Sequence, residues 1–271
     1  MAKILYGRPV SEKIKKSLTQ KVREMGEKPS LLIIQVGNRD DSNIYIKNKV
    51  TFGEEIGVRV FHKKFDEKIN QKEIEEKIYG LVRDDTYRGV IIQLPLPFGL
   101  NTENILKMIP NNKDADGLSP GGDGDYLNII TPATARAVMA ILDYYEFDIL
   151  DKKVVVLGKS RLAGEPIALL LSRNGADVRI FDKESNKEEV KLNSKVSDIL
   201  ISATGNPNLI TKEYVNENQV VIDVGINRLG EKIVGDVDFD NVSKIVKAIT
   251  PVPGGVGPLT VACLFENLLE L

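Results

Sequence analysis

Two patterns of apolar residues occur in the first part of the chain, and each predicts a different kind of element. Segments 30–36 and 88–93 are almost continuously apolar, which is typical of strands buried on both faces of a sheet. Residues 58–62 alternate apolar and polar side chains, as a half-buried strand does. Helical spacing of apolar residues predicts helices over 42–56 and 71–83. Strands that alternate with helices favour an α/β fold with a mainly parallel sheet.

The same alternation returns after residue 132. A helix is predicted over 133–145, and the last helix of the chain over 257–269. Four apolar strands lie between them, at 153–157, 177–181, 198–202 and 219–223. Residues 110–132 separate the two blocks and are rich in Gly, Pro, Asn and Asp, with one Gly-Gly-Asp-Gly-Asp turn at 121–125. This composition marks a loop or linker, and we place the domain boundary there.

Length and charge narrow the class of protein. The chain has 271 residues and a formal net charge of -2. A chain of this size buries roughly 75% of its unfolded surface, so it needs no disulfide or metal to stabilise its core. The even balance of charge argues against a broad basic face for nucleic acid or anionic lipid. Because no apolar run is long enough to span a membrane and residues 1–10 lack a leader pattern, we expect a cytoplasmic protein.

Cysteine and histidine each occur once, which removes several kinds of site. Cys263 has no second cysteine to pair with, and His62 has no second histidine with which to bind a metal. We therefore predict no metal site. Since His62 ends the alternating segment 58–62, we interpret it as an ordinary strand-end residue rather than part of a Ser-His-Asp triad. The chemistry must then use Lys, Tyr, Asp, Glu, Ser or a bound cofactor.

A turn that contains glycine follows the strand at 153–157. Gly158 permits a tight turn close to a pyrophosphate, and the helix after Gly164 offers free N–H groups and the positive end of its dipole. Ser160 replaces the second glycine of Gly-x-Gly-x-x-Gly, and the frame is one residue longer than usual. The turn predicts a dinucleotide site, although a βα turn without a ligand has the same features.

The end of the next strand bears on the choice between NAD and NADP. Asp182 has the spacing of a carboxylate that accepts a hydrogen bond from a ribose 2'-hydroxyl. Four cations are also expected in this region, Lys159, Arg161, Arg179 and Lys183, and cations favour a 2'-phosphate. These residues leave both cofactors open.

Tyr45 and Lys49 are four residues apart in the helix predicted over 42–56, so they share one face. A tyrosine hydroxyl beside a lysine amine forms a workable acid–base pair where burial lowers the pKa of such an amine. The same spacing also occurs on solvated helix surfaces. In short-chain dehydrogenases the pair follows the glycine-rich turn, whereas Tyr45 precedes Gly158, and this order argues against that family.

Three loops carry further candidate residues. Gln93 ends the strand at 88–93 and begins the segment Gln-Leu-Pro-Leu-Pro, at the carboxyl end of a strand, where open α/β sheets bind ligands. Asp116 lies in a Lys-Asp-Ala-Asp-Gly loop near the domain boundary. Residues 250–260 form a loop rich in Pro and Gly that enters the last helix. Taken singly, each loop also has a purely structural interpretation.

Together these segments resemble the bifunctional methylenetetrahydrofolate dehydrogenase/cyclohydrolase family. Ser-x-x-Tyr-(Ile/Val)-x-x-Lys, Gln-Leu-Pro-Leu-Pro, Lys-Asp-x-Asp-Gly, Gly-x-Ser-x-x-x-Gly-x-Pro and Pro-Gly-Gly-Val-Gly-Pro occur in the family's order over essentially the whole chain. The resemblance implies a cytoplasmic homodimer of an α/β enzyme with two domains around a cleft. Residues 1–131 with the C-terminal helix 255–271 would form the folate-binding catalytic domain, and 132–254 a Rossmann-like NAD(P)-binding domain.

The resemblance also implies a function and a set of site residues. The family oxidises 5,10-methylenetetrahydrofolate to the methenyl form with NADP+ and hydrolyses that product to 10-formyltetrahydrofolate. By position, Lys49 is the essential lysine, Tyr45 is its partner, and Gln93 holds the lysine. The pterin ring is bound by Asp116 and lies beside Pro253 and Gly254. The cofactor is lined by Gly158, Lys159, Ser160, Lys183, Ile226 and Thr260.

The chain departs from the family pattern in three places. Residues 132–135 read Pro-Ala-Thr-Ala where the family has Pro-Cys-Thr-Pro, and Leu259 replaces the usual Met. The His-Ser-x-Thr that follows the second Rossmann strand is replaced by Asp-Lys-Glu-Ser at 182–185. Lys183 is itself a phosphate partner, so we expect NADP, with NAD left open by Asp182.

Two other functions compete with this interpretation. A dehydrogenase of the same build that acts on shikimate or an amino acid would share the Rossmann half. It is not expected to combine the Gln93 segment with Tyr45 and Lys49. A catalytically silent nucleotide-binding module would need neither Lys49 nor Asp116.

Overall fold

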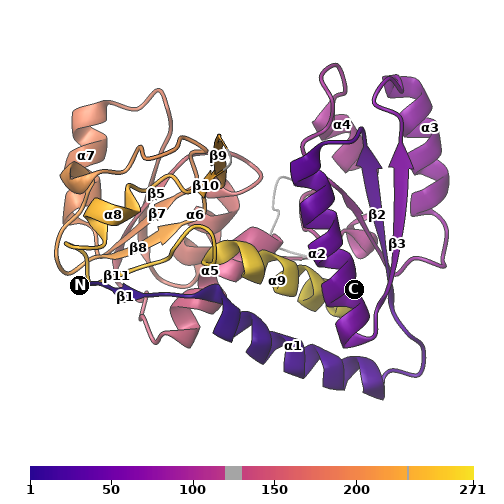
Figure 1. Ribbon diagram of the computed structural model, residues 1–271, viewed down its shortest axis with the longest axis horizontal. Coiled ribbons are helices and arrows are strands. Elements are labelled where there is room, and N and C mark those ends of the chain that lie inside the picture. The colour runs from indigo at the N-terminus through magenta and orange to yellow at the C-terminus, as the bar shows by residue number, and fades with distance from the viewer. Residues whose placement is uncertain (120–129, 231) are drawn as a thin grey trace. The chain divides into compact units, whose positions relative to one another are not determined.

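The computed structural model of the chain describes residues 1–119, 130–230 and 232–271 (Figure 1). The turn predicted at 121–125 lies outside the described residues. Among the described residues, no helix combines the length and apolar character needed to cross a membrane.

The chain divides into two compact units, one with a six-stranded main sheet and one with a three-stranded sheet. The six-stranded unit comprises Met1–Glu12 and Thr134–Thr260, and the three-stranded unit comprises Lys13–Ala133 and Val261–Leu271. The division falls within the first helix, α1 (Gly7–Glu24), and the last, α9 (Val256–Glu270).

The sheet of the three-stranded unit is parallel, as its sequence predicts. Strand β2 (Ser30–Val36) lies between β3 (Arg59–Phe65) and β4 (Gly89–Ile92). It is buried over its whole length, whereas β3 is an edge strand that is partly exposed and extends further than predicted. Parallel neighbours need crossover connections, and helices α2 (Asp40–Ile56) and α3 (Gln71–Val82) supply them (Figure 1).

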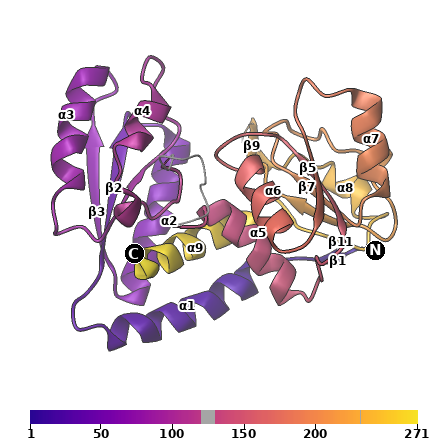
Figure 2. The ribbon, with the colours of Figure 1, turned by 180° about the vertical axis from the view of Figure 1, so that it is seen from behind.

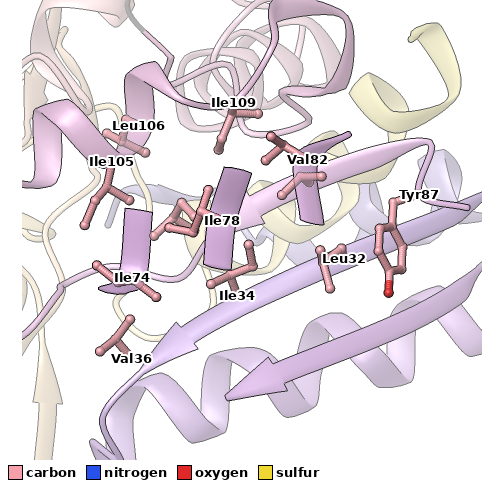
Figure 3. Close-up of a cluster of buried hydrophobic side chains, with 12 residues drawn as sticks. Leu32, Ile34, Val36, Ile74, Ile78, Val82, Tyr87, Ile105, Leu106 and Ile109 are labelled. Atoms are coloured by element: carbon pink, nitrogen blue, oxygen red, sulfur yellow. The ribbon is translucent and has the colours of Figure 1, made fainter. Parts of the chain in front are cut away.

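One face of β2 contributes to an apolar core (Figure 3). Alternate residues of a strand share a face, and residues four apart share a helix face. The cluster contains alternate residues of β2 and residues four apart in α3, and α4 (Thr102–Lys107) also contributes to it. Its buried members are Leu32, Ile34, Val36, Ile74, Ile78, Val82, Tyr87, Val90, Ile92, Ile105, Leu106 and Ile109. The core includes residues of β2 and β4, and the candidate residue Gln93 directly follows β4.

The six-stranded unit has the strand order β1-β11-β8-β7-β5-β6, with every pairing parallel. In chain order the strands are β1 (Lys3–Ile4), β5 (Lys153–Leu157), β6 (Asp177–Phe181), β7 (Ile199–Ser202), β8 (Val220–Asp223) and β11 (Ala248–Ile249). The predicted ranges of β5 and β6 are confirmed, and β7 and β8 each begin one residue later than predicted. This is the doubly wound arrangement expected for a Rossmann-like domain.

Helices cover both faces of this sheet. Helices α7 (Lys187–Val196) and α8 (Phe239–Val242) lie on one face (Figure 1), and α6 (Gly164–Arg173) lies on the other (Figure 2). Helix α5 (Ala133–Tyr144) precedes β5, and short 3-10 helices span Asn111–Lys113 and Lys212–Tyr214. A separate antiparallel hairpin is formed by β9 (Asn227–Leu229) and β10 (Lys232–Val234). The sequence patterns predicted neither this hairpin nor the pairing of β1 with β11.

Candidate active site

Helix α2 presents Lys49 on its buried side. The residue is 9% exposed and shares its helix face with Ile46 and Gly53, which are also buried. A side chain on Gly53 would clash, because a Cβ there would lie 2.4 Å from Val60 of β3. The helix therefore packs closely against the sheet, and this packing directs the Lys49 stem along the interior of the unit.

Gln93 accepts a hydrogen bond from the amine of Lys49. Lys49 Nζ donates a hydrogen bond of 3.2 Å to Gln93 Oε1, and Gln93 Nε2 donates one of 2.8 Å to the carbonyl oxygen of Leu94. The Leu94–Pro95 peptide bond is cis. The backbone N–H of Gln93 donates to Ile34 O at 2.8 Å, which ties the residue to the sheet. Both ends of the Gln93 amide are thus fixed, with its oxygen facing the amine.

Tyr45 lies one helical turn before Lys49 and is partly buried. Burial raises the pKa of the Tyr45 hydroxyl, and the nearby charge of Asp41 acts in the same direction. The hydroxyl therefore stays protonated at neutral pH and can donate a hydrogen bond. Among the described residues, no hydrogen bond joins this hydroxyl to the Lys49 amine.

The loop that carries Asp116 is shaped by a second carboxylate, Asp114. Asp114 accepts a hydrogen bond of 3.0 Å from the N–H of Gly117 and another from the N–H of Ser119. It is 4% exposed, and burial raises its pKa to about 6, with the charge of Asp116 acting in the same direction. Sequence reasoning noted Asp114 only as part of the loop. The sequence feature that could have indicated its role is a carboxylate three residues before Gly117, where it can accept hydrogen bonds from the N–H groups of the following turn.

Two further contacts hold this loop in the three-stranded unit. Asp114 forms an isolated β-bridge with Val90 of β4, and Asn267 of α9 donates a hydrogen bond of 3.0 Å to the carbonyl oxygen of Ala115. Asp116 itself is partly exposed. The loop therefore lies beside β4, the strand that Gln93 directly follows, and the partly exposed carboxylate of Asp116 is available to a ligand.

In the six-stranded unit, the turn after β5 leaves no room for side chains at its two glycines. Gly158 has a φ of 99°, and a Cβ there would lie 2.2 Å from the carbonyl oxygen of Ala203. A Cβ at Gly164, the first residue of α6, would lie 1.6 Å from Gly158 O. Lys159 and Ser160 between them are exposed. This backbone cradle at a helix N-terminus fits the pyrophosphate of a dinucleotide.

Asp182, which follows β6, makes its hydrogen bonds within its own turn. Its Oδ1 accepts from the N–H of Glu184 at 2.9 Å and from both the N–H and the hydroxyl of Ser185 at 3.1 Å. The bonds from Glu184 and Ser185, with the charge of Lys159, hold the pKa of Asp182 below its usual value. Lys183 beside it is exposed. One carboxylate oxygen is thus committed to the turn, and Lys159 and Lys183 supply positive charge nearby.

The remaining predicted residues lie in the loops after β8 and β11 and at the start of α9. Ile226 is 46% exposed. Pro253 follows a cis peptide bond, and Gly254 has a φ of 108°. The hydroxyl of Thr260 donates to the carbonyl oxygen of Val256 at 3.4 Å, within α9. Among the predicted site residues, a hydrogen bond joins Lys49 to Gln93, and Tyr45 lies on the same helix as Lys49. No hydrogen bond between described residues joins the other predicted residues to this pair.

His62 lies inside β3 rather than at its end, because the strand continues to Phe65. The ring Nε2 of His62 lies 2.9 Å from Gln35 Oε1, and burial, together with the charge of Lys64, lowers its pKa. Over 1–119, 130–230 and 232–271, no group of three or more His, Cys, Asp or Glu residues is placed to hold a metal ion.

Comparison with known proteins gives matches over nearly the whole chain. The catalytic domain of tetrahydrofolate dehydrogenase/cyclohydrolase matches residues 5–116, and the NAD(P)-binding domain matches residues 132–271. A bifunctional protein FolD of Mycoplasma mobile is 43% identical over 99% of this chain and 96% of its own length. These matches extend across both units.

Solved structures give the same result. The bifunctional enzyme FolD of Campylobacter jejuni, a methylenetetrahydrofolate dehydrogenase/cyclohydrolase, is 37% identical with a TM-score of 0.91, over 100% of this chain and 98% of its own. The enzyme of Trypanosoma brucei, solved with NADP cofactor and an inhibitor, is 34% identical with a TM-score of 0.93, over 99% of this chain and 96% of its own.

Proposed function

Because the chain belongs to the tetrahydrofolate dehydrogenase/cyclohydrolase family, we propose that Lys49 and Gln93 carry the folate chemistry of a bifunctional enzyme. The enzyme oxidises 5,10-methylenetetrahydrofolate to 5,10-methenyltetrahydrofolate with NADP+ and hydrolyses the product to 10-formyltetrahydrofolate. The observation that supports the assignment of these residues is the hydrogen bond from the buried Lys49 amine to the fixed amide of Gln93.

The two reactions place different demands on the protein. Oxidation removes a hydride from the methylene bridge, and bound NADP+ supplies the nicotinamide ring that accepts it. The bridge becomes a methenyl cation. Water then adds to the bridge carbon, the bond from that carbon to one ring nitrogen breaks, and one proton is released. The second reaction therefore needs a group that accepts and returns protons beside the bridge carbon.

Lys49 is suited to that task. A lysine amine exchanges protons readily when it has an unprotonated fraction, and it has three donor positions when charged. Gln93 is a neutral acceptor, so it orients the amine without adding a charge. Tyr45, whose hydroxyl stays protonated, donates to the substrate or stacks on it. We assign proton transfer during hydrolysis to Lys49, orientation to Gln93, and substrate contact to Tyr45.

Asp116 is assigned to the pterin ring. A partly exposed carboxylate on a fixed loop accepts two N–H groups of a planar heterocycle in bidentate fashion. Asp114 holds that loop through the N–H groups of Gly117 and Ser119. Pro253 and Gly254 are placed beside the pterin by their position in the Pro-Gly-Gly-Val-Gly-Pro segment.

The cofactor is assigned to the turn after β5. The glycine contacts at Gly158 and Gly164 leave a backbone cradle whose free N–H groups suit a pyrophosphate. The side chains of Lys159, Ser160 and Lys183, all of which are exposed, are proposed to contact the cofactor there, together with Ile226 and Thr260. Because Asp182 commits one oxygen to its own turn and two lysines are close to it in sequence, the region favours the 2'-phosphate of NADP over the 2'-hydroxyl of NAD.

The functional domains follow from these assignments. Residues 1–131 with 255–271 are proposed to bind folate, and residues 132–254 to bind NADP. The enzyme is proposed to be a cytoplasmic homodimer, a state supported by the family resemblance. The cytoplasmic assignment is also supported by the presence of a single cysteine, Cys263, which has no second cysteine in the chain to pair with.

A direct assay of both reactions tests the function. Purified protein is given 5,10-methylenetetrahydrofolate with NADP+ or NAD+ in parallel, and the absorbance of the reduced nicotinamide and of the methenyl product is followed. We expect reduction of NADP+, a smaller rate with NAD+, and loss of added methenyltetrahydrofolate without any nicotinamide. Reduction only with shikimate or an amino acid would favour the competing dehydrogenase, and no turnover of any of these would favour a silent module.

A further inference from the structure

Two carboxylates lie buried at one edge of the six-stranded sheet and have no part in the chemistry above. Asp223 is the last residue of β8 and is 3% exposed, and Asp236, which follows β10, is fully buried. A buried carboxylate is costly unless hydrogen bonds replace its hydration. Where each bond goes therefore indicates what the pair holds in place.

Asp236 accepts hydrogen bonds from the end of β7, from the turn after it and from the start of β9. Its Oδ2 accepts from the hydroxyl of Ser202 at 3.0 Å, from the N–H and hydroxyl of Thr204 at 2.7 and 2.9 Å, and from the N–H of Gly205 at 3.2 Å. Its Oδ1 accepts from Asn227 Nδ2 at 2.9 Å. One side chain thus fixes the turn that follows β7 and the residue directly after Ile226.

Asp223 fixes the segment that carries Asp236. Its Oδ1 accepts from the N–H groups of Gly225 and Asp236, both at 3.0 Å, and its Oδ2 accepts from the N–H of Val237 at 2.9 Å. Its own N–H donates to the hydroxyl of Thr250 at 2.7 Å. Thr250 begins the loop that carries Pro253, so the pair connects three loops of the same unit.

The surrounding glycines show how closely the backbone is fitted around the carboxylates. A Cβ at Gly225 would lie 2.0 Å from Asp236 Oδ1, and a Cβ at Gly235 would lie 1.9 Å from Asp223 Oδ2. Both glycines have ordinary φ angles, since neither is among the glycines of positive φ. Their role is therefore space for the carboxylates rather than backbone freedom.

The cluster lies at the edge of the sheet where ligands bind. Ser202 ends β7, Asp223 ends β8 and Thr250 directly follows β11, so all three mark the carboxyl ends of parallel strands. Open α/β sheets bind nucleotides outside these ends. Of the segments held by Asp236, the turn at Thr204 and Gly205 is partly exposed, and Ile226 is exposed.

We propose that Asp236 is a positioning residue for the cofactor, because it holds the 204–205 turn and Asn227, which directly follows Ile226. Asp223 supports it by holding the segment from Asp236 to Val237. The proposal rests on the proposed function, in which this unit binds NADP. It makes Asp236 specific to cofactor binding and to the dehydrogenase reaction, since the hydrolysis of the methenyl bridge needs no hydride acceptor.

The test compares cofactor binding with an activity that does not use the cofactor. Asp236→Ala leaves the donors of Ser202, Thr204 and Asn227 without their acceptor. We expect its dissociation constant for NADP+, measured by calorimetry, and its KM for NADP+ to rise by about tenfold or more. Its cyclohydrolase kcat and KM with methenyltetrahydrofolate are expected to stay within about twofold of the wild-type values.

Two further variants separate positioning from general damage. Asp236→Asn keeps one oxygen for the donors on the Oδ2 side, so we expect NADP+ affinity to return to within about threefold of wild type. Asp240→Ala, an exposed residue of α8, serves as the matched control and is expected to change neither activity. If Asp236→Ala does not fold, Thr204→Val and Asn227→Ala each remove one contact and are expected to weaken NADP+ binding by about threefold.

The outcomes are distinct. NADP+ affinity unchanged in Asp236→Ala, or in both Thr204→Val and Asn227→Ala, overturns the positioning role. Equal losses of dehydrogenase and cyclohydrolase activity in Asp236→Ala, with no recovery in Asp236→Asn, also overturn it, because that result indicates a purely structural residue. A wild-type protein that binds no NADP+ would overturn the proposed function itself.

Discussion

Two of the buried polar centres among the described residues are built in opposite ways. In the three-stranded unit, the amine of Lys49 donates to one neutral amide at 3.2 Å. In the six-stranded unit, Asp236 accepts five hydrogen bonds, from side chains and backbone alike. A group that must exchange protons cannot have every position committed, whereas a group that fixes loops gains from each added bond. We therefore propose a chemical role for the first centre and a supporting role for the second.

The largest effect is expected at the amine. Lys49→Met keeps most of the side-chain length and removes the group that transfers protons, so we expect cyclohydrolase activity to fall by about a hundredfold or more. The rate of loss of methenyltetrahydrofolate absorbance measures it. Lys47→Met, an exposed position on the same helix, is the control and should leave the rate unchanged. Wild-type hydrolysis by Lys49→Met would remove Lys49 from the mechanism.

A smaller loss is expected when the amine keeps its chemistry but loses its orientation. Gln93→Ala removes the acceptor of the Lys49 hydrogen bond, and we expect cyclohydrolase kcat to fall by about tenfold to thirtyfold. Gln20→Ala, on the exposed side of α1, is the matched control. A loss in Gln93→Ala as large as that in Lys49→Met would mean that Gln93 takes part in the chemistry rather than orienting the amine.

Cofactor choice is expected to change without any effect on hydrolysis. Lys183→Glu replaces a cation by an anion in the region assigned to the 2'-phosphate, and we expect kcat/KM for NADP+ to fall by about tenfold while that for NAD+ stays within about twofold. Lys187→Glu, exposed in the first turn of α7, is the control for a general change of charge. Equal losses with both cofactors would place Lys183 away from the 2'-phosphate.

The carboxylate centre should affect stability through pH. Burial, with the charge of Asp236, raises the pKa of Asp223 to about 7 from 3.8. The stabilisation from its protonated form is therefore complete below about pH 4 and is lost as pH rises through 7, about 1 kcal/mol of it between pH 6 and 8. Asp223→Asn cannot titrate, so the fall in its unfolding free energy over that range should be smaller. Denaturant titration at several pH values measures this, with Asp240→Asn as the control.

The elements around the chemical centre could be predicted because their signals are local. The almost continuous apolar run at 30–36 is the fully buried β2, and the helical spacing of Tyr45 and Lys49 is retained in α2. Gln93 follows directly after β4, at the end of a strand that an apolar run also predicted. Each of these features depends only on residues that are close together in the sequence.

The supporting centre could not be predicted in this way. Asp236 stands in a Gly-Asp-Val segment that has the composition of a turn. Its partners come from the end of β7, the turn after β7 and the start of β9, namely Ser202, Thr204 and Asn227. Strand β1 has only two residues, and its partner β11 lies near the far end of the chain. Such contacts exist only once the sheet has formed, so no local pattern contains them.

Helix α1 was overlooked for a different reason. Val10, Leu18 and Val22 are buried at helical spacing, so a periodic signal was present. The helix is otherwise rich in charged and polar residues, which dilutes that signal over its length.

We propose that hydrolysis and cofactor binding depend on different units of the chain. Titration of NADP+ into Lys49→Met by calorimetry, beside its cyclohydrolase rate, tests this most directly. We expect the dissociation constant of Lys49→Met for NADP+ to lie within about twofold of the wild-type value, and its hydrolysis rate to fall by about a hundredfold. An amine-free variant that loses NADP+ affinity in proportion to its hydrolysis rate would contradict it.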